Sequence, residues 1–242
     1  QEMVESYELK TIGGFPDWTA WHNTSGTNDE PPYADLEPRF QASILYNSAS
    51  WKGRKIEPFI DGTDGWASWK DDAVPAGRTV TGYFLRKMLD ENIDLSKDGS
   101  TQPWTAFRLA EVLLNYAEAC YRSNATADAN AAVRKVRARV GLPYQDKSGS
   151  DLMAAIMQER KVELAFEGFY YWDMKRWKLA ESAFTGKRVH GLKIEKEGAG
   201  FKYTYVDCDK QDRNFPAKMY RIPLPTAEIT NNTAVKQFPE WN

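Results

Sequence analysis

Excess charge, long apolar runs and cysteine are all scarce in this sequence of 242 residues. The 32 Lys and Arg residues nearly balance the 34 Asp and Glu residues, and a formal net charge of −2 gives no electrostatic attraction toward nucleic acid. No apolar run approaches the roughly 18 residues of a transmembrane helix. The two cysteines, Cys120 and Cys208, make no disulfide framework, so cysteine usage leaves the cellular compartment open.

Motifs for metals, nucleotides and nucleophilic catalysis are missing as well. The two histidines, His22 and His190, have no HExxH or Glu-x-x-His motif around them. The aspartates at 207, 209 and 212 are spaced faintly like a calcium loop, but no glycine and no bidentate glutamate follow in register. GxGxxG and P-loop patterns are absent, and no histidine is placed to activate a serine or cysteine. We therefore predict no metal site and no cofactor.

Helical periodicity dominates the second half of the chain. Apolar residues recur at helical spacing over Trp104–Arg122, and a second helical pattern runs over residues 129–140 until Gly141 stops it. Two such helices make an αα-hairpin of about the length of a tetratricopeptide unit. The amphipathic run Asp151–Trp177 predicts one long or two consecutive helices, with Gly168 suited to a helix end.

Strand patterns are fewer and shorter. Residues 40–46 alternate partly between apolar and polar side chains, and residues 79–88 predict another strand. Residues 187–206 predict a hairpin in which the sequence EGAG makes the turn. The sequence thus predicts a mainly α fold over residues 1–242 as a single domain, with a helical core, long loops and a few short strands.

Three glutamates form a row in the amphipathic run. They are Glu159, Glu163 and Glu167, spaced four apart. Such a row repels itself unless bases neutralise it. Together with Asp173 the row could supply the acid and base of a glycosidase, which needs two carboxyls about 5 to 9.5 Å apart. The interpretation we favour is a charge network that ties helices together through Arg160 and Arg176, which are close in sequence. In such a network, loss of one partner lowers the stability of the fold by on the order of 3–5 kcal/mol.

Five stretches, in order along the chain, resemble motifs of the SusD/RagB family. The most specific is ERKVELAFEGFYYWDMKRW at residues 159–177, which resembles ERxxELxxEGxRxxDxxRW, with Tyr170 where the family usually has Arg. Of the other four, PYADLEPRF is similar to PYxxRDPRF, and RLAEVLLNYAEA is similar to RxAExxLxxAEA. VRKVRARVGLP is similar to NxVRxRAGLP, and IPLPTAEITNNTAVKQFPEW is similar to IPxxEIxxNPxLxQNPGW.

The resemblance covers nearly the whole chain but only the C-terminal half of a family member. It implies a SusD-like helical fold with tetratricopeptide-like helix pairs and a loop-rich ligand face. It also implies a lipoprotein of the outer membrane, on the cell surface, that captures a glycan and passes it to a SusC-like TonB-dependent transporter. The lipid-bearing cysteine and the N-terminal tetratricopeptide half, a partner of this half, would lie outside this chain. We expect a fragment, since the chain begins without an initiator Met or signal sequence.

Two loops at residues 11–38 and 47–78 exceed the usual connection length, and both contain tryptophan. An indole ring stacks on the apolar C–H face of a sugar at low entropic cost. Location in loops predicts exposure of these rings, with packing of the loops onto the core as the alternative. The candidate ligand-binding residues are Trp18, Trp21, His22, Asp64, Trp66 and Trp69. The tryptophans of the family motifs are predicted to be core residues, namely Trp104, Trp172, Trp177 and Trp241.

The function predicted from these observations is non-catalytic binding of an oligosaccharide or polysaccharide. Three alternatives stay open. The same loops could hold a peptide, the carboxylates Glu159 to Asp173 could make a glycoside hydrolase, or the chain could be a helical module that binds only a protein partner. Binding without turnover would exclude the hydrolase.

Overall fold

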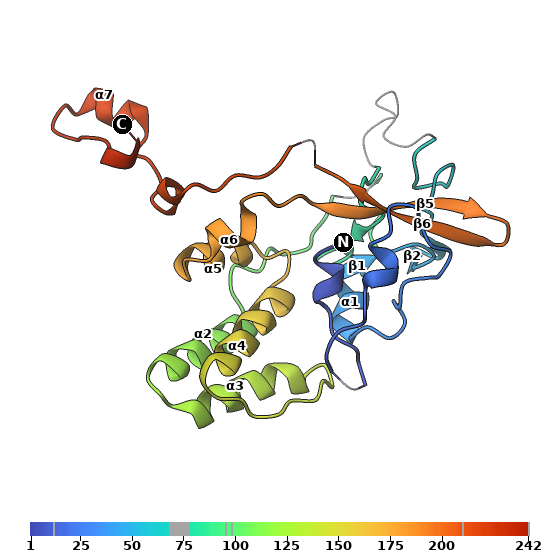
Figure 1. Cartoon of the computed structure of the whole chain (residues 1–242), viewed down its shortest axis with the longest axis horizontal. Coiled ribbons are helices and arrows are strands. Elements are labelled where there is room, and N and C mark those ends of the chain that lie inside the picture. Colours follow the sequence, from blue (N-terminus) through green and yellow to red (C-terminus); the bar gives the residue numbers. More distant parts are fainter. Residues whose placement is uncertain (12, 68–77, 95, 98, 210, 242) are drawn as a thin grey trace.

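The computed structural model describes residues 1–241 apart from 12, 68–77, 95, 98 and 210. Helices form the largest body, and the β elements and long loops lie to one side of it (Figure 1). This arrangement confirms the predicted mainly α fold with long loops and a few short strands. The helices are α1 (Pro38–Ser43), α2 (Leu109–Arg122), α3 (Thr126–Ala138), α4 (Gly149–Glu163), α5 (Phe169–Arg176), α6 (Ala180–Phe184) and α7 (Thr226–Asn231).

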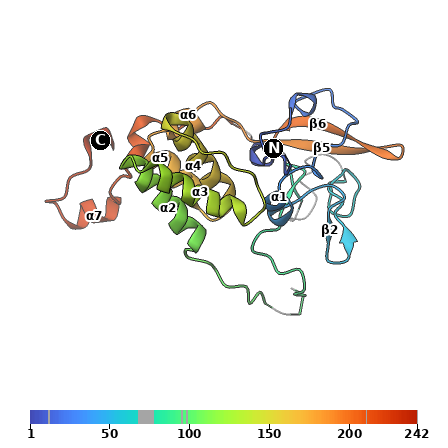
Figure 2. The same cartoon turned by 90° about the horizontal axis from the view of Figure 1, so that it is seen from below.

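Helices α2 and α3 form the predicted αα-hairpin, and α4 packs against α2 (Figure 2). Ala117 of α2 and Ala132 of α3 are buried together with Leu152 of α4, and the small side chains of the two alanines let α2 and α3 approach closely. Helix α2 begins at Leu109 rather than at Trp104 as predicted. The side chain of Trp104 is 71% exposed, so the segment before α2 has no buried face to stabilise another helical turn.

The run from residue 151 to 177 folds as two consecutive helices, one of the two predicted outcomes. Helix α4 ends at Glu163, and α5 begins at Phe169. Gly168, immediately before α5, has a φ of 86°, a left-handed conformation that glycine adopts without a Cβ clash. The break therefore lies where the sequence places its glycine.

Within the described residues, the β structure consists of two-stranded antiparallel pairs. The longest pair confirms the predicted hairpin, with Leu192 opposite Tyr205 and Ile194 opposite Tyr203. The pairs are β1 (Ile44–Leu45) with β4 (Phe84–Leu85), β2 (Ser50–Trp51) with β3 (Arg54–Lys55), and β5 (His190–Glu197) with β6 (Gly200–Asp207).

The strands predicted at residues 40–46 and 79–88 are mostly wrong, because only the two-residue strands β1 and β4 form there. Helix α1 occupies most of the first region. Pro38 takes the first helical position, where its fixed φ suits a helix and its missing N–H costs nothing. The helical turn places Phe40 in the core and Arg39 among buried carboxylates, and these contacts outweigh a weak alternating pattern.

Aromatic side chains from the loop-rich part build a core that reaches the helical body. Tyr33 stacks on Phe40 with ring centroids 5.6 Å apart, and Tyr7 meets Phe40 edge-on at 5.5 Å. Val162 of α4 packs in the same cluster. The loops and the helices therefore share a core and hold each other in place.

The motif tryptophans are less buried than predicted. Trp104 is 71% exposed and Trp172 is 53% exposed, so the prediction of core positions is wrong for both. Trp177 and Trp241 are half-buried. Residues two apart point in directions about 200° apart around a helix, so burial of Met174 turns Trp172 toward solvent.

The row of glutamates is buried and neutralised, but by bases distant in sequence rather than by the nearby ones predicted. Glu159 is 1% exposed, contacts Arg39 of α1 and lies 3.0 Å from Arg137 of α3. Glu163 Oε1 lies 2.6 Å from Arg108 Nη1. Burial alone would raise the pKa of Glu163, but the hydrogen bond from Arg108 and the surrounding positive charge outweigh it and lower that pKa.

Arg160 and Arg176 bind a different carboxylate, and in doing so they tie helices together as predicted. Arg160 Nε lies 2.8 Å from Asp173 Oδ2, and Arg176 Nε lies 2.8 Å from Asp173 Oδ1. Arg176 also reaches Glu118 of α2, with its Nη2 at 2.6 Å from Oε2. These contacts join α4, α5 and α2, and removal of one partner would leave a buried charge unpaired.

Candidate functional site

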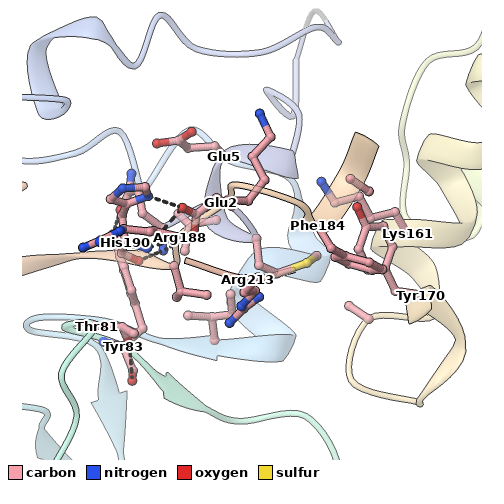
Figure 3. A pocket seen from close by; sticks show the side chains of 18 of the residues that line it. Glu2, Glu5, Thr81, Tyr83, Lys161, Tyr170, Phe184, Arg188, His190 and Arg213 are labelled. Atoms are coloured by element: carbon pink, nitrogen blue, oxygen red, sulfur yellow. Dashed lines mark hydrogen bonds and ion pairs between the residues drawn. The ribbon is translucent and has the colours of Figure 1, made fainter. Parts of the chain in front are cut away.

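A cavity of about 1080 Å³ lies between the N-terminal segment, the β5–β6 hairpin and the helices α4 and α6 (Figure 3). Its lining combines apolar side chains with rings and charged groups, the composition typical of sites for small molecules. Rings in the lining include those of His22, Tyr83, Tyr170, Phe184, His190 and Tyr205.

One wall belongs to the hairpin and the N-terminal segment and is built around Tyr205. His190 stacks on the Tyr205 ring with centroids 4.7 Å apart, and His22 approaches the same ring at 4.8 Å. Each imidazole has a carboxylate partner. His22 Nε2 lies 2.5 Å from Glu5 Oε1. His190 Nδ1 lies 2.6 Å from Glu2 Oε1. Figure 3 shows these two side chains together on the hairpin side of the cavity.

Burial governs the chemistry of the tyrosines in this wall. It raises the pKa of Tyr205 from 10 to about 12, so its hydroxyl, already neutral at physiological pH, stays protonated and able to donate even in alkaline solution. The segment that carries Tyr83 packs closely against strand β5, where the backbone of Thr81 approaches that of Gly191. A Cβ on Gly191 would come within 2.3 Å of Thr81 Cα. Only glycine permits that approach, which the Leu192 N–H secures by donating to the Thr81 carbonyl at 3.0 Å.

The opposite wall comes from α4, α5 and α6 and contains the ammonium group of Lys161. Lys161 Nζ lies 5.6 Å from the centre of the Tyr170 ring, and Tyr170 meets Phe184 edge-on at 6.1 Å. Within the described part of the chain, the Lys161 ammonium has no hydrogen bond and no ion pair. Burial lowers the pKa of Lys161, against the opposing influence of Glu2 and Glu5.

Two arginines between these walls are neutralised by aspartates. Arg188 Nη1 lies 2.9 Å from Asp207 Oδ2, and its Nε lies 2.6 Å from Asp212 Oδ1. Arg213 Nε lies 3.3 Å from Asp209 Oδ2. These are the aspartates with the faintly calcium-like spacing, and arginines are their partners here. Among the residues that the structure describes, no group of three His, Cys, Asp or Glu side chains could hold a metal ion.

The first cluster of sequence candidates is divided between the core and the cavity. Trp18 is 7% exposed and packs in the aromatic core, so its predicted exposure is wrong. Trp21 is half-buried, meets Trp18 edge-on at 5.7 Å and donates its indole N–H to the Asp29 carbonyl at 2.9 Å. His22 lines the cavity. The 3-10 turn Thr19–Trp21 places Trp18 and Trp21, three residues apart, on the same side, whereas His22, one residue further on, points about 120° away from them.

The second cluster lies away from the cavity. Trp66 is half-buried and donates its indole N–H to the Thr79 carbonyl at 2.7 Å. Arg54 binds Asp64 through two hydrogen bonds of 2.6 Å, and the pair lowers the pKa of Asp64 despite partial burial. Both candidates therefore stabilise their own loop. Trp69 lies outside the described residues.

Most residues that line the cavity were not among the sequence candidates. The rings and the cation described above are examples, namely Tyr83, Lys161, Tyr170, Phe184, His190 and Tyr205. No periodic pattern joins these residues, since the tertiary fold brings them together from separate helices and strands. Only Tyr170 gave a signal in the sequence, because it stands where the family motif usually has Arg.

The described helices include none that is both long enough and apolar enough to span a membrane. Comparison with known proteins places the whole chain in one family. The profile of the SusD family matches residues 1–241, and the chain belongs to that family.

Relatives show how much of a family member this chain represents. It is 31% identical over 210 residues to SusD-like protein P2 of Formosa agariphila, a match covering 82% of this chain and 36% of that protein. It is 25% identical over 261 residues to a SusD-like protein of Bacteroides ovatus, covering 97% of this chain and 45% of that protein. The chain thus spans less than half the length of these curated relatives.

Solved structures have the same fold. The crystal structure of a SusD-like protein from Bacteroides fragilis superimposes with a TM-score of 0.79 at 25% identity, covering 98% of this chain and 45% of that one. A SusD-like carbohydrate-binding protein of the same species gives a TM-score of 0.69 at 24% identity, covering 97% of this chain and 47% of that one.

Proposed function

We propose that this protein binds an oligosaccharide or polysaccharide without chemical turnover, and that the cavity between the hairpin and the helices is its binding site. The observation that carries this proposal is the combination of rings and hydrogen-bonding groups around one cavity in a chain of the SusD family. Tyr170 is 39% exposed and offers a ring face, while His22 offers an imidazole edge. Stacking and hydrogen bonding to hydroxyls require these two kinds of group.

The expected affinity is modest. Each hydroxyl of a sugar exchanges hydrogen bonds with water for hydrogen bonds with protein, and the net gain of such an exchange is only about 0.5–1.5 kcal/mol. A few of these bonds and one or two stacked rings support dissociation constants in the range of roughly micromolar to millimolar. Trp21 and Trp66 stay candidates for further contacts at the loops, together with Trp69.

We also propose the cellular role that the family resemblance implies. The protein would stand at the cell surface, anchored in the outer membrane through a lipid on a cysteine outside this chain, and pass its glycan to a SusC-like TonB-dependent transporter. The N-terminal half of a family member would cover the apolar face of α2. Leu109, Val112 and Tyr116 support this part, because they are 71%, 51% and 52% exposed and lie along one side of that helix.

The hydrolase alternative finds no support in the positions of the carboxylates. Glu159 and Glu163 are 1% and 2% exposed, and arginines bind both of them. Asp173 is 4% exposed and bound by Arg160. None of the three lines the cavity. A glycosidase needs its two carboxyls on either side of the scissile bond, in contact with substrate.

Calorimetry or affinity electrophoresis against a panel of polysaccharides tests the proposed binding. His22→Ala and Tyr170→Ala should each weaken the binding of a recognised glycan by roughly 2-fold to 10-fold, the effect of losing one ring contact. Trp172→Ala is the matched control, since this ring is 53% exposed but lies outside the cavity. Analysis of the glycan after incubation detects any cleavage.

Each outcome separates the alternatives. If no glycan binds, the saccharide proposal fails, and a peptide panel tests the second candidate ligand. If the glycan is cleaved, the non-catalytic part is wrong. If binding is equal in wild type, His22→Ala and Tyr170→Ala but lost in Trp21→Ala or Trp66→Ala, the ligand binds at the loops rather than in the cavity.

A further inference from the structure

Lys161 is the cavity residue whose surroundings leave its charge uncompensated. It belongs to α4, whose other charged residues near it, Arg160 and Glu163, are both engaged in ion pairs. The Lys161 ammonium instead lies over the Tyr170 ring at 5.6 Å. A cation–π contact stabilises an ammonium by less than the ammonium loses when burial removes it from water.

The acids that share the cavity are already committed to other partners. Glu5 is paired with His22 and Glu2 with His190, both on the hairpin side. Figure 3 shows Glu2 and His190 across the cavity from Lys161 and Tyr170. The helix side of the cavity therefore presents a positive charge beside an aromatic face.

The arginines do not supply the same feature. Arg188 and Arg213 line the cavity, but aspartates accept their hydrogen bonds. Lys187, the other lysine in the lining, is exposed, so its charge is well hydrated without a partner. Among the cations of the cavity, Lys161 combines partial burial with the absence of an acidic partner in the described chain.

We propose, on the basis of the saccharide binding proposed above, that the ligand is an acidic saccharide whose carboxylate or sulfate group binds the Lys161 ammonium while its ring packs on Tyr170. The oxygen atoms of either group accept charge-assisted hydrogen bonds from an ammonium, and these are stronger than bonds to a neutral hydroxyl. A neutral sugar would occupy the cavity and leave the ammonium only partly solvated. The anion restores the interactions that burial removes.

The direction of the Lys161 pKa agrees with this assignment. Burial lowers it from its ordinary value, so the charged form is disfavoured in the free protein. An anion bound beside the ammonium stabilises the charged form and raises the pKa again. Binding of the acidic ligand should therefore weaken as the pH rises through the lowered pKa, whereas binding of a neutral analogue should not.

Matched pairs of ligands test the assignment. One pair is an oligogalacturonate and its fully methyl-esterified form, and the other is a sulfated dextran oligosaccharide and the unsulfated one. Wild type should bind one or both charged members at least roughly 10-fold more tightly than their neutral partners, the effect of one charge-assisted hydrogen bond. A preference within the galacturonate pair indicates that Lys161 binds a carboxylate, and a preference within the dextran pair indicates that it binds a sulfate.

Three variants locate the effect. Lys161→Met keeps a side chain of similar length without the charge and should abolish the preference, so that the charged members bind no more tightly than the neutral ones. Lys161→Arg should retain most of it. Lys196→Met is the control, because Lys196 is an exposed lysine of β5 that does not line the cavity. Circular dichroism of each variant checks the fold.

Several results would overturn the assignment. Equal binding of charged and neutral members by wild type refutes it while leaving the proposed function intact. An equal loss for both members in Lys161→Met shows a structural role and also refutes it. A preference that survives in Lys161→Met but disappears in Lys196→Met places the anion elsewhere. No binding of any saccharide, charged or neutral, refutes both proposals.

Discussion

Replacement of Glu118 by Gln isolates one buried carboxylate in the junction between α2 and α5. The Glu118 side chain is 7% exposed, and Arg176, Arg122 and the indole N–H of Trp177 bind it at 2.6 to 3.0 Å. Burial alone would raise the pKa of Glu118, but these hydrogen bonds outweigh it and lower the pKa to about 2. Glutamine keeps the shape and one acceptor oxygen but removes the charge.

The magnitude follows from that pKa. A fall from an ordinary value of 4.5 to about 2 corresponds to roughly 3.4 kcal/mol of stabilisation at about 1.36 kcal/mol per pH unit. Arg122 and Arg176 are 59% and 40% exposed, so solvent screening reduces the figure, and we expect Glu118→Gln to lower the free energy of unfolding by about 1–2 kcal/mol at pH 7.

The sign of the pH dependence is fixed by the direction of the shift. Because the folded pKa of Glu118 lies below the unfolded one, its stabilisation is complete above pH 4.5 and is lost as the pH falls toward 2. Urea unfolding of wild type and Glu118→Gln should therefore differ at pH 7 and converge toward pH 2. Glu181→Gln, an exposed residue of α6, is the control. Equal stability of wild type and Glu118→Gln at pH 7, or a difference that does not change with pH, would refute the reasoning.

Three further changes test the structure. Arg39→Met should lower the free energy of unfolding, measured in urea, by on the order of 3–5 kcal/mol, because it leaves buried carboxylates unpaired. Arg134→Met breaks an exposed ion pair and should lower it by less than about 1 kcal/mol. Similar losses in the two variants would contradict the buried network. Trp18→Ala should lower stability by about 3–5 kcal/mol and Trp172→Ala far less, and the reverse order would contradict the observed burial. Above pH 10 the free energy of unfolding should fall with pH, because tyrosines ionise in the unfolded state while Tyr205 stays neutral in the fold, and Tyr205→Phe should make this fall less steep. If the free energy of unfolding fell equally steeply in wild type and Tyr205→Phe, the pKa of Tyr205 would not be raised in the folded protein.

The helical part of this protein was predictable because its signals are local. Apolar periodicity identified the α2–α3 hairpin. Helix α3 ends at Ala138, three residues before Gly141, and Gly168 immediately precedes α5. The β5–β6 hairpin was equally visible from its alternation and turn. Short strands were not, since a two-residue strand such as β1 carries no periodic pattern and depends on its partner.

The candidate site was predicted only in part. Two residues of the first tryptophan cluster show this. His22 lines the cavity, whereas Trp18, four residues earlier, is buried in the core. A loop pattern indicates neither burial nor the direction of a side chain, because both depend on the surface onto which the loop folds. Trp172 shows the same limit in a helix, where a motif position predicted a core residue and the ring is exposed.

Local sequence determined the helices, their ends, the hairpin and the family of this protein, because each of these depends on side chains a few residues apart. Only the tertiary structure decided which base neutralises which acid. Glu159 pairs with Arg39, which lies 120 residues earlier, rather than with a base in its own helix. The cavity arises in the same way, since Lys161 and Tyr205 meet only after α4 and the hairpin have packed. Electrostatic attraction and packing depend on distances in the folded structure, and the order of residues along the chain does not give these distances.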